Sequence, residues 1–186
     1  MSETIAILNT ALAIGGVLVF LVSSILVVDL YTSRVFAKLI DLWGMVVALV
    51  FTVSSTVLTL VYSEVFGFVP CGLCWLQRVF LYPQVILLAM ALVYKEKVAA
   101  RYGLVLSILG FFVAIYQHYL QMGGAELVAC PTSGGDCAKR FLFEFGFVTF
   151  PLLSAFLFVF LVALYMYILK TRGSAHGKQA ERNESH

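Results

Sequence analysis

The chain has 186 residues, of which 62% are hydrophobic and 12% are charged, and its mean hydropathy is +1.00. A soluble domain carries roughly 25% charged residues, and a soluble fold of this length could not bury so much apolar surface. These values exclude a soluble protein and predict a polytopic membrane protein with one domain. The net charge of +2 comes from dispersed basic residues that form no patch, so no nucleic-acid partner is expected.

The first apolar run covers about residues 5–30 and is long enough to cross a membrane, which takes about 20 residues. A cleaved signal peptide is the competing interpretation. It is disfavoured because the run is too long, no Lys or Arg precedes it, and Glu3 is acidic. A short polar link leads to a second run over about residues 42–69, in which the charged residue Glu64 lies near the end.

Two cysteines, Cys71 and Cys74, stand in C-x-x-C spacing where the second run ends and a third, over about residues 75–94, begins. If this run is helical from about Cys74, Arg78 lies one turn further along on the same face. Unpaired N–H groups and the helix dipole favour a thiolate at a helix start, and a guanidinium adds to this. The stretch therefore predicts a redox-active dithiol at the membrane surface. Pro83 is expected to kink the helix or loosen one turn, which membrane spans tolerate.

The fourth run covers about residues 102–122 and carries an ionisable residue, His118, near its far end. The loop that follows, residues 123–147, is the longest link between apolar runs. It holds a second close pair of cysteines, Cys130 and Cys137, in a Gly-rich segment. An even number of cysteines in two close pairs suggests disulfides, and hence an oxidising compartment if both pairs lie on the outer side.

The last run covers about residues 148–169, which makes five predicted spans. The sequence therefore predicts an all-α membrane protein, in which residues 1–41 form an additional N-terminal helix with a cytoplasmic link. Residues 42–170 form a four-helix transmembrane bundle. The polar tail, residues 171–186, is expected to be disordered and cytoplasmic.

Membrane orientation follows from the distribution of Lys and Arg, which favour the cytoplasmic side. With the N-terminus outside, nine of these residues lie on the inner side: Arg34, Lys38, Lys95, Lys97, Arg101, Lys170, Arg172, Lys178 and Arg182. Three lie on the outer side: Arg78, Lys139 and Arg140. This bias predicts an N-out, C-in chain. It also puts both cysteine pairs on the extracytoplasmic side, although the cysteines were not used to set the orientation.

Two dithiol pairs on one side of a membrane can pass a disulfide between them by thiol–disulfide exchange. The loop pair is suited to meeting a soluble partner, and the C-x-x-C pair to meeting a molecule in the lipid. Net disulfide formation needs a two-electron acceptor, and the sequence has no Gly-rich nucleotide motif and no haem attachment motif. A lipid-soluble quinone is the natural candidate, since it would reach Arg78 and His118 near the outer leaflet.

Simpler interpretations remain open for each of these features. The four cysteines could form two inert structural disulfides in a structural membrane protein. Arg78 could be an interfacial anchor that reaches the headgroups, and His118 could be a core histidine bonded to a neighbouring helix, although an ionisable residue in a span is a functional candidate. A tetrathiolate zinc site is disfavoured because the pairs lack a suitable setting and would face an oxidising compartment. No metal site is therefore predicted.

The residues 70–78, PCGLCWLQR, followed by Tyr82 and Pro83, resemble the signature of the disulfide bond formation protein B family (DsbB, in its BdbC-like branch). The loop from Cys130 to Cys137 and the stretch at 145–151, FGFVTFP, resemble the same family. The resemblance covers about residues 42–170. The first span lies outside it, and the close spacing of the loop pair is typical of the BdbC-like branch.

The resemblance implies a four-helix bundle that reoxidises a thioredoxin-like, DsbA-type dithiol oxidase and reduces ubiquinone or menaquinone in the bacterial cytoplasmic (inner) membrane. Cys130 would accept the partner's electrons and Cys137 would pass them to Cys71. Cys74 would react with the quinone, Arg78 would stabilise the charge, and His118 stands where the family often has a quinone-side histidine. The redox-active disulfides would be Cys71–Cys74 and Cys130–Cys137. A vitamin K epoxide reductase-like enzyme is the alternative, but there the C-x-x-C pair follows the loop cysteines.

Overall fold

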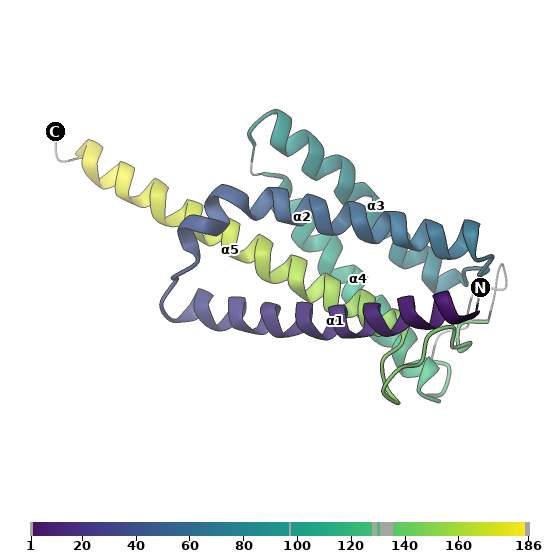
Figure 1. Ribbon diagram of the computed structural model, residues 1–186. Helices are drawn as coiled ribbons and strands as arrows, with labels where there is room; N and C mark the ends of the chain where they lie inside the picture. Colours follow the sequence, from purple (N-terminus) through teal and green to yellow (C-terminus); the bar gives the residue numbers. More distant parts are fainter. Residues whose placement is uncertain (1, 97, 128–129, 131–135, 185–186) are drawn as a thin grey trace.

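The computed structural model describes residues 2–96, 98–127, 130 and 136–184, and for residues 2 and 172–184 it describes the backbone alone. Over these residues all regular secondary structure is helical (Figure 1). The elements are α1 (Ser2–Tyr31), α2 (Ala37–Leu60), the π-helical turn η1 (Val61–Val65), α3 (Gly72–Val93), α4 (Ala99–Gln121) and α5 (Phe150–Glu184).

Five of these helical stretches are long and apolar enough to cross a membrane. They are Glu3–Tyr31, Ala37–Val65, Gly72–Val93, Ala99–Gln121 and Phe150–Thr171. The prediction of an all-α membrane protein with five spans is therefore confirmed.

The helix α5 is the centre of the packing. It contacts α4, α1 and α2, and in Figure 1 it runs lengthwise through the molecule with α1 along one side. Its side chains Phe158, Leu161, Tyr165 and Ile168 are almost completely buried. A helix that is apolar on all sides buries most of its surface against other helices, and this places the core of the bundle along α5.

The helices α4 and α5 approach closely because α4 presents glycine to its neighbour. A Cβ atom built on Gly110 would lie 2.4 Å from the Phe158 ring, so only glycine leaves room for that ring. Small residues at helix contacts of this kind are a common basis of packing in membranes, where apolar surface gains nothing by leaving lipid.

The second span ends in an unusual turn that leads into the C-x-x-C stretch. The chain passes from α2 into the π-helical turn η1, which turns the buried Tyr62 toward the interior, and Gly67 then takes a left-handed conformation with φ of 70°. π-Helical turns occur often at functional sites. This turn and the extended residues after it bring Cys71 to the start of α3.

The structure corrects the expected start of the third helix, which lies at Gly72 rather than at about Cys74. Cys71 has an extended backbone, and its sulfur accepts a hydrogen bond from the Cys74 N–H at 3.3 Å. Cys71 therefore takes the place of the polar side chain that usually caps a helix, and this cap starts the helix earlier.

The expected disordered tail after residue 170 also differs from the structure, in which α5 continues without a break to Glu184. The segment is polar but rich in Ala, Lys, Gln, Glu and Arg, which are strong helix formers. An existing helix gains one hydrogen bond for each residue added, so α5 can continue past its apolar span although the segment also contains Gly173 and Gly177. The division of the chain into an N-terminal helix, a bundle and a tail stays a prediction.

Candidate active site

Cys71 and Cys74 lie together at the start of α3, and their sulfur atoms are 2.8 Å apart. Cys71 is 2% exposed, and Cys74 is partly buried. The pKa of the Cys71 thiol is raised, first because this thiol hydrogen-bonds to Cys74 and then because it is buried. The two sulfurs are close enough that a two-electron oxidation, with loss of the thiol protons to an acceptor, would join them in a disulfide with only a small movement.

A side-chain amide from α4 contacts both sulfurs. The Gln117 Nε2 group donates to the sulfurs of Cys71 and Cys74 at 3.1 Å each. Gln77, three residues after Cys74, donates through its own Nε2 to the Gln117 Oε1 atom at 2.6 Å, and all of this lies inside the bundle. Because the carbonyl of Gln117 is occupied by Gln77, its N–H₂ group stays aimed at the sulfurs, where it can stabilise a thiolate.

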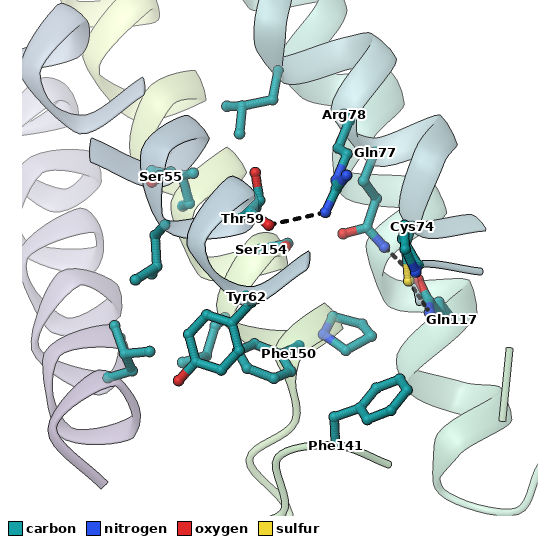
Figure 2. Close-up of a pocket in the computed structure, with 18 of the residues that line it drawn as sticks. Ser55, Thr59, Tyr62, Cys74, Gln77, Arg78, Gln117, Phe141, Phe150 and Ser154 are labelled. Atoms are coloured by element: carbon teal, nitrogen blue, oxygen red, sulfur yellow. Dashed lines mark hydrogen bonds between the residues drawn. The ribbon is translucent and has the colours of Figure 1, made fainter. Parts of the chain in front are cut away.

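Arg78 lies on the next turn of α3 and is 8% exposed. Its Nη2 atom donates to the Thr59 carbonyl oxygen at 3.0 Å, and its guanidinium carbon lies 5.0 Å from the centre of the Trp75 ring. An interfacial anchor would extend to the headgroups, but this side chain is held inside the bundle between α2 and α3. Figure 2 shows it on the same side of the cavity as Cys74.

The second cysteine pair is a disulfide, Cys130–Cys137, and it belongs to the same hydrophobic cluster as Cys71 and Cys74. Cys137 is 1% exposed, whereas Cys130 is only partly buried. The segment after Cys137 is fixed to the end of α4, because the Gln121 amide donates to the Lys139 carbonyl at 2.9 Å. The structure thus brings the four predicted cysteines together, with Cys137 as the inner member of the loop pair.

A cavity of about 580 Å³ opens beside the C-x-x-C pair, as Figure 2 shows. One end is polar, and its lining includes Cys74, Gln77, Arg78 and Gln117. The rest is mainly apolar and is lined by residues of α1, α2 and α5. Tyr62 and Phe150, whose rings are 4.7 Å apart in an edge-on contact, lie between these two parts. This shape suits a ligand with a polar head and an apolar chain.

His118 does not belong to this cavity as the structure describes it. Its Nδ1 atom forms a hydrogen bond with the hydroxyl of Thr149, the residue just before α5, at 2.8 Å. His118 is not among the described residues that line the cavity. The simpler interpretation, a histidine bonded to a neighbouring helix, accounts for this contact. The neighbouring residue, Gln117, points at the sulfurs instead.

Replacing Gln117 with Leu is expected to lower the reduction potential of the Cys71–Cys74 pair by about 30 mV. The reduced form loses the free energy of roughly one hydrogen bond, and for a two-electron couple this free energy corresponds to a shift of about 30 mV. The rate of thiolate reactions at Cys74 should fall with it. Titration of the pair against a dithiol redox buffer would measure the shift. Ile115→Leu, on the same helix at a 38% exposed position, is the control, and equal potentials in both variants would contradict the assigned role of Gln117.

Comparison with known proteins adds a family to this geometry. Residues 41–168 match the family described as disulfide bond formation protein DsbB. The chain is similar to the SPbeta prophage-derived disulfide bond formation protein B of Bacillus subtilis, with 35% identity over 115 residues that cover 62% of this chain and 78% of that protein. It is also similar to disulfide bond formation protein C of Bacillus subtilis, with 36% identity over 128 residues, or 67% and 88% of the two chains.

A probable disulfide formation protein of Metapseudomonas resinovorans is 33% identical over 120 residues, which cover 63% of this chain and 83% of that protein. No solved structure matches the chain. The matched region contains α3, α4 and most of α2 and of the membrane-spanning part of α5, and it leaves out α1.

Proposed function

The chain belongs to the DsbB family of disulfide bond formation proteins, and on that premise we propose that it is a membrane thiol:quinone oxidoreductase. In this role it reoxidises a thioredoxin-like, DsbA-type dithiol oxidase outside the cytoplasm. The observation that carries the proposal is the common cluster of four cysteines beside a cavity with one polar end. Cys71 and Cys74 are its redox pair at the cavity, and Cys130 and Cys137 are the pair that meets the partner.

In the first exchange, a thiolate of the reduced partner attacks the Cys130 sulfur, and Cys137 leaves as the thiolate. The partner's second thiol resolves the mixed disulfide, so the partner becomes a disulfide and the loop pair becomes two thiols. Cys137 then attacks the Cys71–Cys74 disulfide at Cys71, and Cys130 resolves the product. The loop disulfide is restored, and two electrons and their protons now reside on Cys71 and Cys74.

The polar end of the cavity fits a quinone, because the buried Arg78 and Gln77 line it next to Cys74 while most of the remaining lining is apolar. Arg78 and Gln77 would hold such a head group, and the apolar lining would hold its chain. When bound, a quinone supplies an acceptor for two electrons and two protons. Arg78 and Gln117 would stabilise negative charge on the Cys74 side, and the raised pKa of the Cys71 thiol favours its neutral form.

We place the protein in the bacterial cytoplasmic membrane, with its N-terminus and both cysteine pairs on the outer side. The basis for this orientation is the uneven distribution of Lys and Arg. A reporter that is active only in the cytoplasm is expected to be active when fused after Lys170, and one that is active only outside the cytoplasm is expected to be inactive there. A cysteine introduced at Lys139 in the loop should react with membrane-impermeant thiol reagents. A cytoplasmic loop or an external tail in this map would invert the assignment.

The direct test uses purified protein, a reduced thioredoxin-like partner and a soluble quinone, followed at the quinone absorbance. Turnover that requires all four cysteines is the expected result. Two inert structural disulfides would survive mild reductant and give no turnover. A vitamin K epoxide reductase-like enzyme is disfavoured because the C-x-x-C pair precedes the loop pair here, and reduction of an epoxide substrate in the same assay would revive it.

A further inference from the structure

The first helix lies outside the part of the chain that matches the family, yet it contributes to the cavity. Ala11, Leu12, Gly15, Gly16 and Val19 of α1 line it together with residues of α2 and α5. Figure 2 shows α1, in pale purple, on the far side of the cavity from Arg78 and Cys74. The helix α1 therefore forms the side of the cavity that lies opposite the redox pair.

Specific contacts fix this wall in position. At the cavity, Asn9 of α1 accepts a hydrogen bond from the Tyr62 hydroxyl at 2.6 Å, and both residues are buried. At the other end of α1, Asp29 accepts a hydrogen bond from the Tyr167 hydroxyl at 2.6 Å and caps the backbone N–H of Val35 at 2.9 Å. These contacts join α1 to η1 and α5, so α1 is part of the bundle rather than a loosely attached span.

Two adjacent glycines of α1 face different surroundings. A Cβ atom built on Gly16 would lie 2.2 Å from the Leu153 side chain, so Gly16 allows α1 to approach α5. A Cβ atom built on Gly15 would meet nothing within 4 Å, although Gly15 lines the cavity. The lack of a side chain at Gly15 therefore widens the cavity, whereas the lack of a side chain at Gly16 allows α1 and α5 to pack closely.

The lining that α2 and α5 contribute is largely apolar and includes Val50 and Leu58 of α2 and Leu153, Phe156 and Leu157 of α5, with the hydroxyls of Ser54, Ser55 and Ser154 among them. Arg78 and Gln77, which would hold a polar head group, lie instead on the far side of the cavity from α1. A ligand with its head at Arg78 must place any attached apolar chain in the remaining space. That space leads toward α1 between α2 and α5.

We propose that α1 is a specificity element for the apolar chain of a membrane quinone, and that Gly15 sets the width through which this chain passes. This inference rests on the proposed function. It gives the N-terminal helix a role in ligand selection. The redox pair lies in the region that matches the family, whereas α1, which lines the other end of the cavity, lies outside that region.

The test compares one benzoquinone head group without a chain and with a decyl chain. Binding is measured by titration calorimetry on the full-length protein in nanodiscs, with its cysteines left oxidised so that no turnover occurs. Gly15→Phe is expected to weaken binding of the decyl quinone about tenfold or more and to leave the chain-free quinone unchanged. Each methylene excluded from apolar contact costs about fourfold in affinity, so the loss of two or three suffices.

Leu18→Phe is the matched control, because it adds an aromatic ring to the same helix at a position that is 57% exposed and outside the cavity lining. Gly15→Leu provides a second, smaller obstruction that improves the helix propensity of α1, and unchanged binding of the chain-free quinone reports that each variant is folded. If Gly15→Phe and the parent bind the decyl quinone equally, or if Leu18→Phe weakens it as much, the inference is overturned. If the parent protein binds neither quinone, the proposed function fails instead.

Discussion

The Cys137→Ala variant is expected to accumulate a mixed disulfide with its partner, while the Cys130→Ala variant accumulates none. The partner used is the thioredoxin-like oxidase with its resolving cysteine removed, and the adduct is read on non-reducing gels after oxidation. Cys130 is only partly buried, whereas Cys137 is 1% exposed and packs in the cluster with Cys71. A thiolate on another protein can reach the outer sulfur, and attack requires access to it.

The contrast between the two single variants should be close to all-or-none, because a sulfur that cannot be reached cannot be attacked. A protein in which Cys71 and Cys74 are both changed to Ala serves as the control. It keeps the loop pair and should still exchange once with the partner, yet give no net turnover. An adduct that forms in Cys130→Ala alone would mean that the two roles are reversed.

The sequence was sufficient for the spans and for the position of the two cysteine pairs, because both leave strong local signals. Apolar runs near 20 residues have few alternatives to a membrane helix, and a C-x-x-C pair between two runs must lie near a membrane surface. The shared side of the two pairs followed from counting spans. The structure adds that all four cysteines meet in one cluster, with Cys137 inside.

The residues that surround the sulfurs were harder to foresee. Gln117 carries no charge and belongs to no motif, and its neighbour His118 attracted the functional interpretation because it is ionisable. Which of two adjacent residues faces α3 depends on the rotation of α4, and this rotation is set by packing such as that of Gly110 against Phe158. Apolar residues occur on all faces of α4, so its hydrophobic periodicity does not indicate which face is buried against the other helices.

The turn that presents Tyr62 was also absent from the prediction, which extended the second run as one helix. A π-helical turn inserts one extra residue into a helix, and no residue type marks its place reliably. The contact between Tyr62 and Asn9 joins segments 53 residues apart in the chain. It depends on where α1 packs, and the sequence predicted α1 only as an additional span.

Replacing Arg78 with Met is expected to weaken apparent quinone affinity and slow quinone reduction, together by roughly 10- to 100-fold, the value of one hydrogen bond to a charged group inside a protein. Met keeps most of the bulk that packs against Trp75 but removes the charge and the donor to Thr59. Disulfide exchange between the partner and the loop pair should be largely kept, because Arg78 lies at the cavity and not at Cys130. Steady-state kinetics against quinone concentration, with single-turnover partner oxidation measured separately, would distinguish the two steps.

Arg78→Lys should restore part of the loss, because Lys keeps the charge but cannot hold the Thr59 carbonyl and a ligand with one planar group. Arg101→Met is the control, since Arg101 is an exposed cation at the start of α4, near the opposite end of the bundle. Its quinone kinetics should match those of the parent. The buried position of Arg78 makes this a demanding test: a guanidinium kept inside the bundle costs desolvation, and unchanged quinone kinetics in Arg78→Met would leave it with a purely structural role at the α2–α3 contact.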